Sequence, residues 1–247
     1  MSIRKSIALS IIICLLPILV FADEGKGILE KVDALASYTD SDFAAQYTIV
    51  EEKKNGDRQK TVSLVFRRDA QSMYTIVIKE PEISQGQGYL KVENSLWFYD
   101  PDSRRFNFSS AKDRFQNTNA RNSDFTKSTL AEDYKVVAIE DEALGRYQCR
   151  KLTLEAVTDE VAYPKMIIWV DENYLLRKSE DYSLSGRLLR VSAFPSYTQI
   201  DGRYVPSRFL LQEVLSKEKT QISISRVSFN DIPNSTFSKQ FLENVSR

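Results

Sequence analysis

Apolar and polar residues alternate with a period of two through most of the chain after residue 42. Phe43, Tyr47 and Ile49 alternate with more polar neighbours, as in a strand that buries one face. Asn55-Gly56 follows, and this dipeptide is typical of tight hairpin turns. The segment therefore predicts an antiparallel hairpin.

The same pattern recurs as far as residues 220–229 and predicts roughly ten or eleven strands in one sheet system. Residues 100–103 and Asp201-Gly202 mark further turns. Two stretches have helical spacing instead, residues 28–35 near the start and residues 235–245 at the end. Short strands with close turns indicate an antiparallel meander with few helices.

The number of strands bears on what the fold encloses. A barrel of about eight strands is just filled by its own side chains, and a wider barrel holds a plug or a cavity. The predicted helices are too few to cover a large open sheet on both faces. The pattern thus favours a closed or nearly closed barrel with a hollow, apolar interior. A flattened pair of sheets with a filled core is the alternative.

One long insert interrupts the strands. Residues 111–132 are polar, whereas most hairpin loops have only about two to five residues. Ser123 can cap a short helix through residues 125–131. The large apolar residues Phe115, Phe125 and Leu130 predict a lid that is anchored reversibly over the barrel mouth. On this interpretation Phe125→Ala costs little stability, because a lid makes few core contacts. The alternative is a disordered surface insertion.

The first 22 residues have the layout of a secretory signal peptide. Arg4 and Lys5 precede an apolar run at residues 7–21, which at 15 residues is shorter than the roughly 20 of a membrane-spanning helix. We expect cleavage between Ala22 and Asp23, which leaves residues 23–247 as a single exported domain. Cys14 is a poor lipoprotein site, because the bulky Ile13 precedes it and the apolar run continues past it.

Composition removes several classes of function. The chain has no His, and Cys149 is the only Cys after cleavage, so the usual general base, zinc ligands and an internal disulfide are all missing. No phosphate-binding loop or nucleophile motif is present. The mature chain has a small excess of acidic residues and no electrostatic basis for binding nucleic acid. These observations predict a protein that is not an enzyme and has no cofactor or metal.

Three short motifs carry a family resemblance. Residues 85–92 read Gln-Gly-Gln-Gly-Tyr-Leu-Lys-Val, residues 96–101 read Leu-Trp-Phe-Tyr-Asp-Pro, and residues 123–126 read Ser-Asp-Phe-Thr. Their order and spacing resemble the LolA-like group of outer-membrane lipoprotein-sorting proteins. Asn122 stands where that family has Gly. The resemblance implies a single unclosed antiparallel β-barrel with a hydrophobic cavity and a few short lid helices.

The resemblance also implies a function. It indicates a periplasmic carrier that binds acyl chains of lipoproteins or phospholipids and delivers them towards the outer membrane. An inner-membrane transporter would be the donor and an outer-membrane protein the acceptor, with the carrier itself a monomer. The alternatives are a periplasmic accessory that presents free lipid to an exporter and a non-catalytic structural adaptor.

Alternation along the strands selects the residues expected to face the cavity, although a register slip of one residue would invert any strand. These candidate ligand-binding residues are Phe43, Tyr47, Leu64, Phe66, Ile76, Leu90, Trp97, Tyr99, Leu152, Leu154, Ile168, Val191 and Phe209.

Overall fold

The computed structural model describes residues 16–245 of the chain, with side chains from Asp23 onward. Arg4 and Lys5, with which the predicted signal peptide begins, and Cys14, the rejected lipoprotein site, lie outside the described residues. The described part contains thirteen strands: β1 (Phe43–Glu52), β2 (Arg58–Arg68), β3 (Met73–Glu80), β4 (Gly88–Val92), β5 (Ser95–Asp100), β6 (Arg105–Ser109), β7 (Tyr134–Leu144), β8 (Tyr147–Ala156), β9 (Lys165–Asp171), β10 (Leu176–Tyr182), β11 (Leu188–Ile200), β12 (Arg203–Glu213) and β13 (Lys219–Ser228).

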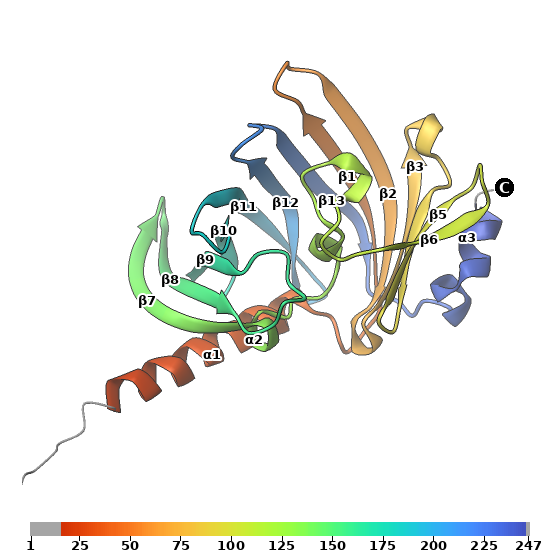
Figure 1. The fold of residues 1–247 in the computed structure, drawn as a ribbon. Helices are drawn as coiled ribbons and strands as arrows, with labels where there is room; N and C mark the ends of the chain where they lie inside the picture. Colours follow the sequence, from red (N-terminus) through yellow and green to blue (C-terminus); the bar gives the residue numbers. More distant parts are fainter. Residues whose placement is uncertain (1–15, 246–247) are drawn as a thin grey trace, which may run out of the picture.

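All thirteen strands form one antiparallel sheet in the order β6-β5-β4-β3-β2-β1-β13-β12-β11-β10-β9-β8-β7. The pairing of β1 with β13, which sets Tyr47 opposite Ile224, joins the two ends of the meander. The sheet curls strongly, and within residues 16–245 its edge strands β6 and β7 do not pair (Figure 1). The prediction of an unclosed antiparallel barrel is thus confirmed, with thirteen strands in place of ten or eleven.

The hairpin turns follow from local backbone preferences. Asp201 and Gly202, between β11 and β12, both have positive φ, at 48° and 76°. A turn of this kind matches the right-handed twist of the flanking strands, and Asp and Gly are among the residues that adopt it most readily. Gly56, with φ 88°, occupies a similar position between β1 and β2. The sequence therefore specifies where these strands reverse.

The helices lie on opposite faces of the sheet. Helix α1 (Leu16–Ala36) packs Ile28, Leu29 and Val32 against the inner face of β8 and β9, where Leu152 and Ile168 are fully buried. Helix α3 (Lys239–Val245) follows a short 3₁₀ turn, η5 (Asn234–Phe237), and packs on the outer face of β2 to β5. The sequence prediction of a helix at each end is confirmed. In the described part of the chain no helix is long and apolar enough to cross a membrane.

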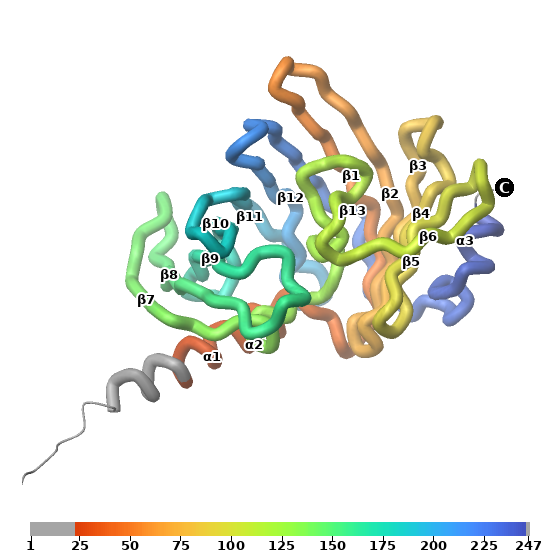
Figure 2. The backbone as a smooth tube through the Cα atoms, in the orientation of Figure 1, coloured from red at the N-terminus to blue at the C-terminus, as the bar shows by residue number. Residues whose placement is uncertain are grey.

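A long connection completes the fold. After β6 the chain runs through residues 110–129, here named the crossing segment, across the opening of the curled sheet to helix α2 (Leu130–Asp133) and β7 (Figure 2). The crossing segment contains two 3₁₀ turns, η3 (Phe115–Asn117) and η4 (Asn122–Phe125). The alternative of a disordered insertion is wrong. The helix expected over residues 125–131 is wrong in its bounds, because η4 ends at Phe125 and the short helix α2 begins only at Leu130 and ends at Asp133.

The contact between α1 and β7 gives a stability prediction. Gly25 is buried, and a Cβ atom built on it would lie 2.6 Å from Cβ of Val136. We expect Gly25→Ala to lower the free energy of unfolding by about 1–3 kcal/mol through overpacking, despite the better helix propensity of Ala.

Gly27 is the matched control, because nothing lies within 4 Å of its added Cβ atom. Gly27→Ala should raise the free energy of unfolding by about 0.5–1 kcal/mol. Urea unfolding of residues 23–247 measures both variants. Equal effects of the two substitutions would contradict the close packing of α1 on β7.

Candidate functional site

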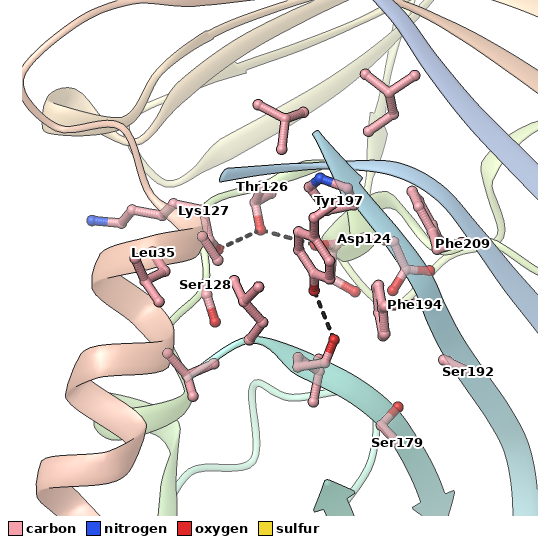
Figure 3. A pocket seen from close by; sticks show the side chains of 18 of the residues that line it. Leu35, Asp124, Thr126, Lys127, Ser128, Ser179, Ser192, Phe194, Tyr197 and Phe209 are labelled. Carbon is pink, nitrogen blue, oxygen red and sulfur yellow. Dashed lines mark hydrogen bonds between the residues drawn. The ribbon is translucent and has the colours of Figure 1, made fainter. Parts of the chain in front are cut away.

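A cavity of about 240 Å³ opens on the inner face of the sheet. It lies between the end of α1, the crossing segment and strands β9 to β13, β1 and β2 (Figure 3), and its wall is mostly apolar. Phe194 and Phe209 stack on one side with ring centroids 5.7 Å apart. Leu35 from α1 approaches from the other side. The enclosed space is thus bounded by elements from both ends of the chain.

The crossing segment fills much of the remaining concavity. Phe115 and Phe125 are fully buried, with ring centroids 4.4 Å apart. Phe125 packs on Tyr47 of β1 and Phe115 on Tyr89 of β4, at 5.6 and 4.9 Å. These contacts place the two rings in the main hydrophobic core, not at a solvent-exposed rim. The expectation that Phe125 makes few core contacts is wrong, and the third predicted lid residue, Leu130, is only partly buried against α1.

A buried carboxyl group holds the first part of the crossing segment. Glu51 of β1 points to the inner face and is 3% exposed. Its carboxylate accepts hydrogen bonds from Asn119 Nδ2, at 3.1 Å, and from the Thr220 hydroxyl of β13. Burial raises the pKa of Glu51 above its usual value, and the hydrogen bond from Thr220 opposes that shift. Asn119 thus ties the segment to the centre of the sheet.

An ion-pair cluster holds the second part. Arg190 of β11 is buried, and its Nη1 and Nη2 donate to Asp124 Oδ2 and Oδ1 at 2.7 and 3.1 Å. Its Nε donates to Asp181 Oδ2 of β10 at 2.7 Å. Burial alone would lower the pKa of Arg190, but the charges of Asp124 and Asp181 outweigh it and raise that pKa. Burial raises the pKa of Asp181. The crossing segment therefore contributes one carboxylate to a cluster that is otherwise part of the sheet.

The end of the crossing segment is bound to α1. The carboxylate of Asp33 accepts hydrogen bonds from the Ser128 hydroxyl at 2.5 Å and from the backbone N–H groups of Leu130 and Ala131 at 3.0 and 2.8 Å. Two of these donors are at the start of α2, where a carboxylate is favourable. At the same end of α1, Arg67 Nη2 of β2 donates to the carbonyl of Ala36, the last residue of the helix, at 3.3 Å. Helix α1 and the crossing segment are thus connected by polar contacts beside the cavity.

The structure places about half of the predicted cavity residues on the inner face. Phe43, Tyr47 and Phe209 line the cavity itself. The others on this face are buried in the core around the crossing segment or beneath α1, and they are Ile76, Leu152, Leu154 and Ile168.

The remaining predicted residues lie on the outer face, which corrects the expected register of four strands. They are Leu64, Phe66, Leu90, Trp97, Tyr99 and Val191. For the residues of β2, β4 and β5 the physical reason is that α3 covers the outer face of β2 to β5, so both faces of these strands carry apolar residues. Phe66, for example, meets Phe241 of α3 edge-on at 6.0 Å. On β11 the inner face carries Arg190 and Ser192, and Val191 between them faces outward. Alternation then shows that a strand has two faces without showing which one turns inward.

Sequence reasoning missed the polar part of the cavity. Arg190, Ser192 and Phe194 occupy alternate positions of β11 and all three line the cavity. A search for apolar residues at a period of two selects Val191 and passes over its neighbours. The only available signal was that Arg190 and Ser192 interrupt the otherwise apolar run of residues 188–195. Within residues 23–245 no three Cys, Asp or Glu side chains gather in a way that would hold a metal ion.

The fold and the cavity define the class of protein. The chain shares the unclosed barrel of a LolA superfamily protein from Nitrosomonas europaea, with 25% identity, a TM-score of 0.77, and coverage of 88% of this chain and 98% of that one. A domain from Vibrio parahaemolyticus, described as a candidate outer membrane lipoprotein-sorting protein, matches at 18% identity and a TM-score of 0.81, covering 90% and 99%. A DUF1329 family protein from Desulfovibrio piger matches at 17% identity and a TM-score of 0.81, covering 90% and 98%. The resemblance to the LolA-like group is thereby confirmed.

A family model described as an uncharacterized protein matches residues 70–244, and the chain belongs to that family. The matched region contains the crossing segment, the ion-pair cluster and nearly all of α3, but not α1, β1 or β2. No curated protein sequence matches the chain.

Proposed function

We propose that this protein is a periplasmic carrier that binds acyl chains of lipoproteins or lipids in the inner cavity and delivers them towards the outer membrane. In this proposal the signal peptide is removed after Ala22, and residues 23–247 act as one non-catalytic domain. An inner-membrane transporter would supply the cargo and an outer-membrane component would receive it. The likeness to the Nitrosomonas europaea and Vibrio parahaemolyticus proteins supports the carrier class.

The observation that carries the proposal is an apolar cavity whose wall is formed partly by the crossing segment, which is not paired into the sheet. The wall formed by the sheet is continuous, but the crossing segment belongs to neither sheet nor helix over most of its length. The cavity is below the roughly 300 Å³ at which typical ligand sites begin, so binding a whole acyl chain requires more room. Movement of Phe115 and Phe125 out of the concavity would supply it. Each methylene then buried contributes about 0.8 kcal/mol, which offsets extraction of the chain from a bilayer.

The packing of those two rings favours a second candidate function. Phe115 and Phe125 are fully buried, which is the arrangement expected for a structural adaptor with a filled core. An adaptor would not bind a lipid chain in the inner cavity. Binding therefore separates the two functions.

We expect a fluorescent fatty-acid probe to bind residues 23–247 saturably. Ser192→Phe should abolish this binding, because Ser192 lines the cavity and a benzyl side chain there would occupy it. Fluorescence titration gives the affinity, and native mass spectrometry of the purified protein identifies which lipid or acylated protein it carries.

Val191→Phe is the matched control, because Val191 adjoins Ser192 in β11 and lies on the outer face of the sheet. This variant should bind the probe like the unmodified protein. Absence of saturable binding by well-folded protein would favour the adaptor. Equal loss of probe binding in the Ser192→Phe and Val191→Phe variants would show that the probe does not enter the inner cavity.

A further inference from the structure

The part of the cavity wall that β11 and its neighbours form has a charged end and an aromatic end. Along β11, Arg190, Ser192 and Phe194 follow one another on the face that lines the cavity. Alternate residues of a strand are roughly 7 Å apart, so these three side chains span about 13 Å. Phe194 stacks on Phe209 of β12 at the aromatic end. A wall of this kind suits a molecule with a polar head and an apolar tail.

The charged end is built from two cross-strand pairs. Asp181 of β10 is opposite Arg190, and Ser179 is opposite Ser192 in the next inward-facing position. Ser192 is 2% exposed, and within residues 23–245 its hydroxyl has no hydrogen-bond partner. An unsatisfied buried hydroxyl costs free energy, and a ligand atom in the cavity would supply the missing partner. This observation is independent of the ion pairs.

The Arg190 guanidinium has one partner on the sheet and one on the crossing segment. Asp181 is fully buried on the neighbouring strand and accepts from Nε. Asp124 accepts from both terminal nitrogens in the two-pronged geometry that Arg forms with carboxylates, and it belongs to the crossing segment. Another carboxylate can take the place of Asp124 without changing the charge of the cluster. The two terminal nitrogens of Arg190 therefore form an anion-binding site that is already in place and that the Asp124 carboxylate occupies.

We infer that the cavity selects a single-chain amphiphile with an anionic head group, which displaces Asp124 from Arg190 while the tail lies along Phe194 and Phe209. The Ser192 hydroxyl donates a further hydrogen bond to the head. Loss of Asp124 from the cluster detaches the crossing segment at its second anchor, so the arrival of cargo itself enlarges the cavity. This inference rests on the carrier function proposed above.

The test compares dodecanoate with 1-dodecanol, which has the same chain and no charge, in calorimetric titrations of residues 23–247 below micelle-forming concentrations. We expect the protein to prefer dodecanoate. In Asp124→Asn the internal competitor for Arg190 is neutral and the side-chain shape is kept. The preference for dodecanoate over dodecanol should then rise by about tenfold or more, the range of a charge-assisted hydrogen bond.

Asp113→Asn is the control, because Asp113 is an exposed carboxylate of the same segment that accepts hydrogen bonds from Ser109 and Ser110 and not from Arg190. Its dodecanoate preference should equal that of the unmodified protein. If Asp124→Asn raises the affinity for both ligands equally, the substitution only loosens the crossing segment. The head-group inference is then wrong, while the carrier function stands. An unmodified protein that binds both ligands equally would also overturn the inference. If neither ligand binds, the carrier function itself fails.

Discussion

Phe125→Ala is expected to lower the free energy of unfolding by about 3–5 kcal/mol, the range for removing a fully buried aromatic ring. Phe125 has no exposed surface and packs on both Phe115 and Tyr47. The substitution would also leave a void next to the cavity, so the remaining folded protein should exchange a bound fatty-acid probe faster. Urea unfolding and stopped-flow displacement of the probe measure the two effects.

Leu184→Ala is a suitable control, because it removes a large apolar side chain that is 77% exposed. It should change the stability by no more than about 0.5 kcal/mol. A similarly small loss of unfolding free energy in Phe125→Ala would show that the crossing segment is not part of the core. Hydrogen exchange through residues 111–132 in lipid-free and lipid-loaded protein tests the same point, since equal exchange in both states would mean that the segment does not respond to cargo.

Arg190→Gln is expected to cost about 3–5 kcal/mol at neutral pH, because it leaves the buried Asp181 without its cation. The loss should depend on pH. The pKa of Asp181 is already raised by burial, and removing Arg190 raises it further. A carboxyl group whose folded pKa lies above its unfolded value loses stability as pH rises through the folded pKa. The loss in free energy of unfolding should therefore be largest near neutral pH. It should shrink as the pH falls towards about 4, the pKa of Asp in the unfolded chain.

Urea unfolding of the variant and of the unmodified protein at several pH values measures this dependence. Arg187→Gln provides the control, since Arg187 is exposed in the turn between β10 and β11. Addition of Asp181→Asn to Arg190→Gln should recover part of the loss, because the uncompensated charge is then absent. A deficit that stays constant with pH would show that electrostatics is not the cause.

The crossing segment shows which features of the fold the sequence could predict. Its length and its three apolar residues identified a segment placed over the sheet, and residues 115–125 do lie there. The sequence could not show that Phe115 and Phe125 enter the core, because the depth of a loop depends on the space left by elements distant in the chain. The partners of these rings, Tyr89 and Tyr47, come from two different strands.

The sequence by itself determined what depends on local chemistry. Period-two alternation, the Asn55-Gly56 and Asp201-Gly202 turns and the helical spacing of residues 28–35 specified a β meander with a helix at its start, because strand pairing through tight hairpins involves only neighbouring segments. Tertiary structure alone decided which face of each strand turned inward. The outer face of β2 to β5 is as apolar as the inner one, and only the position of α3 assigns it to the outside. Tertiary structure also brought Arg190 to Asp124, 66 residues away, and so created the polar end of the cavity, because no local pattern links two charges on separate elements.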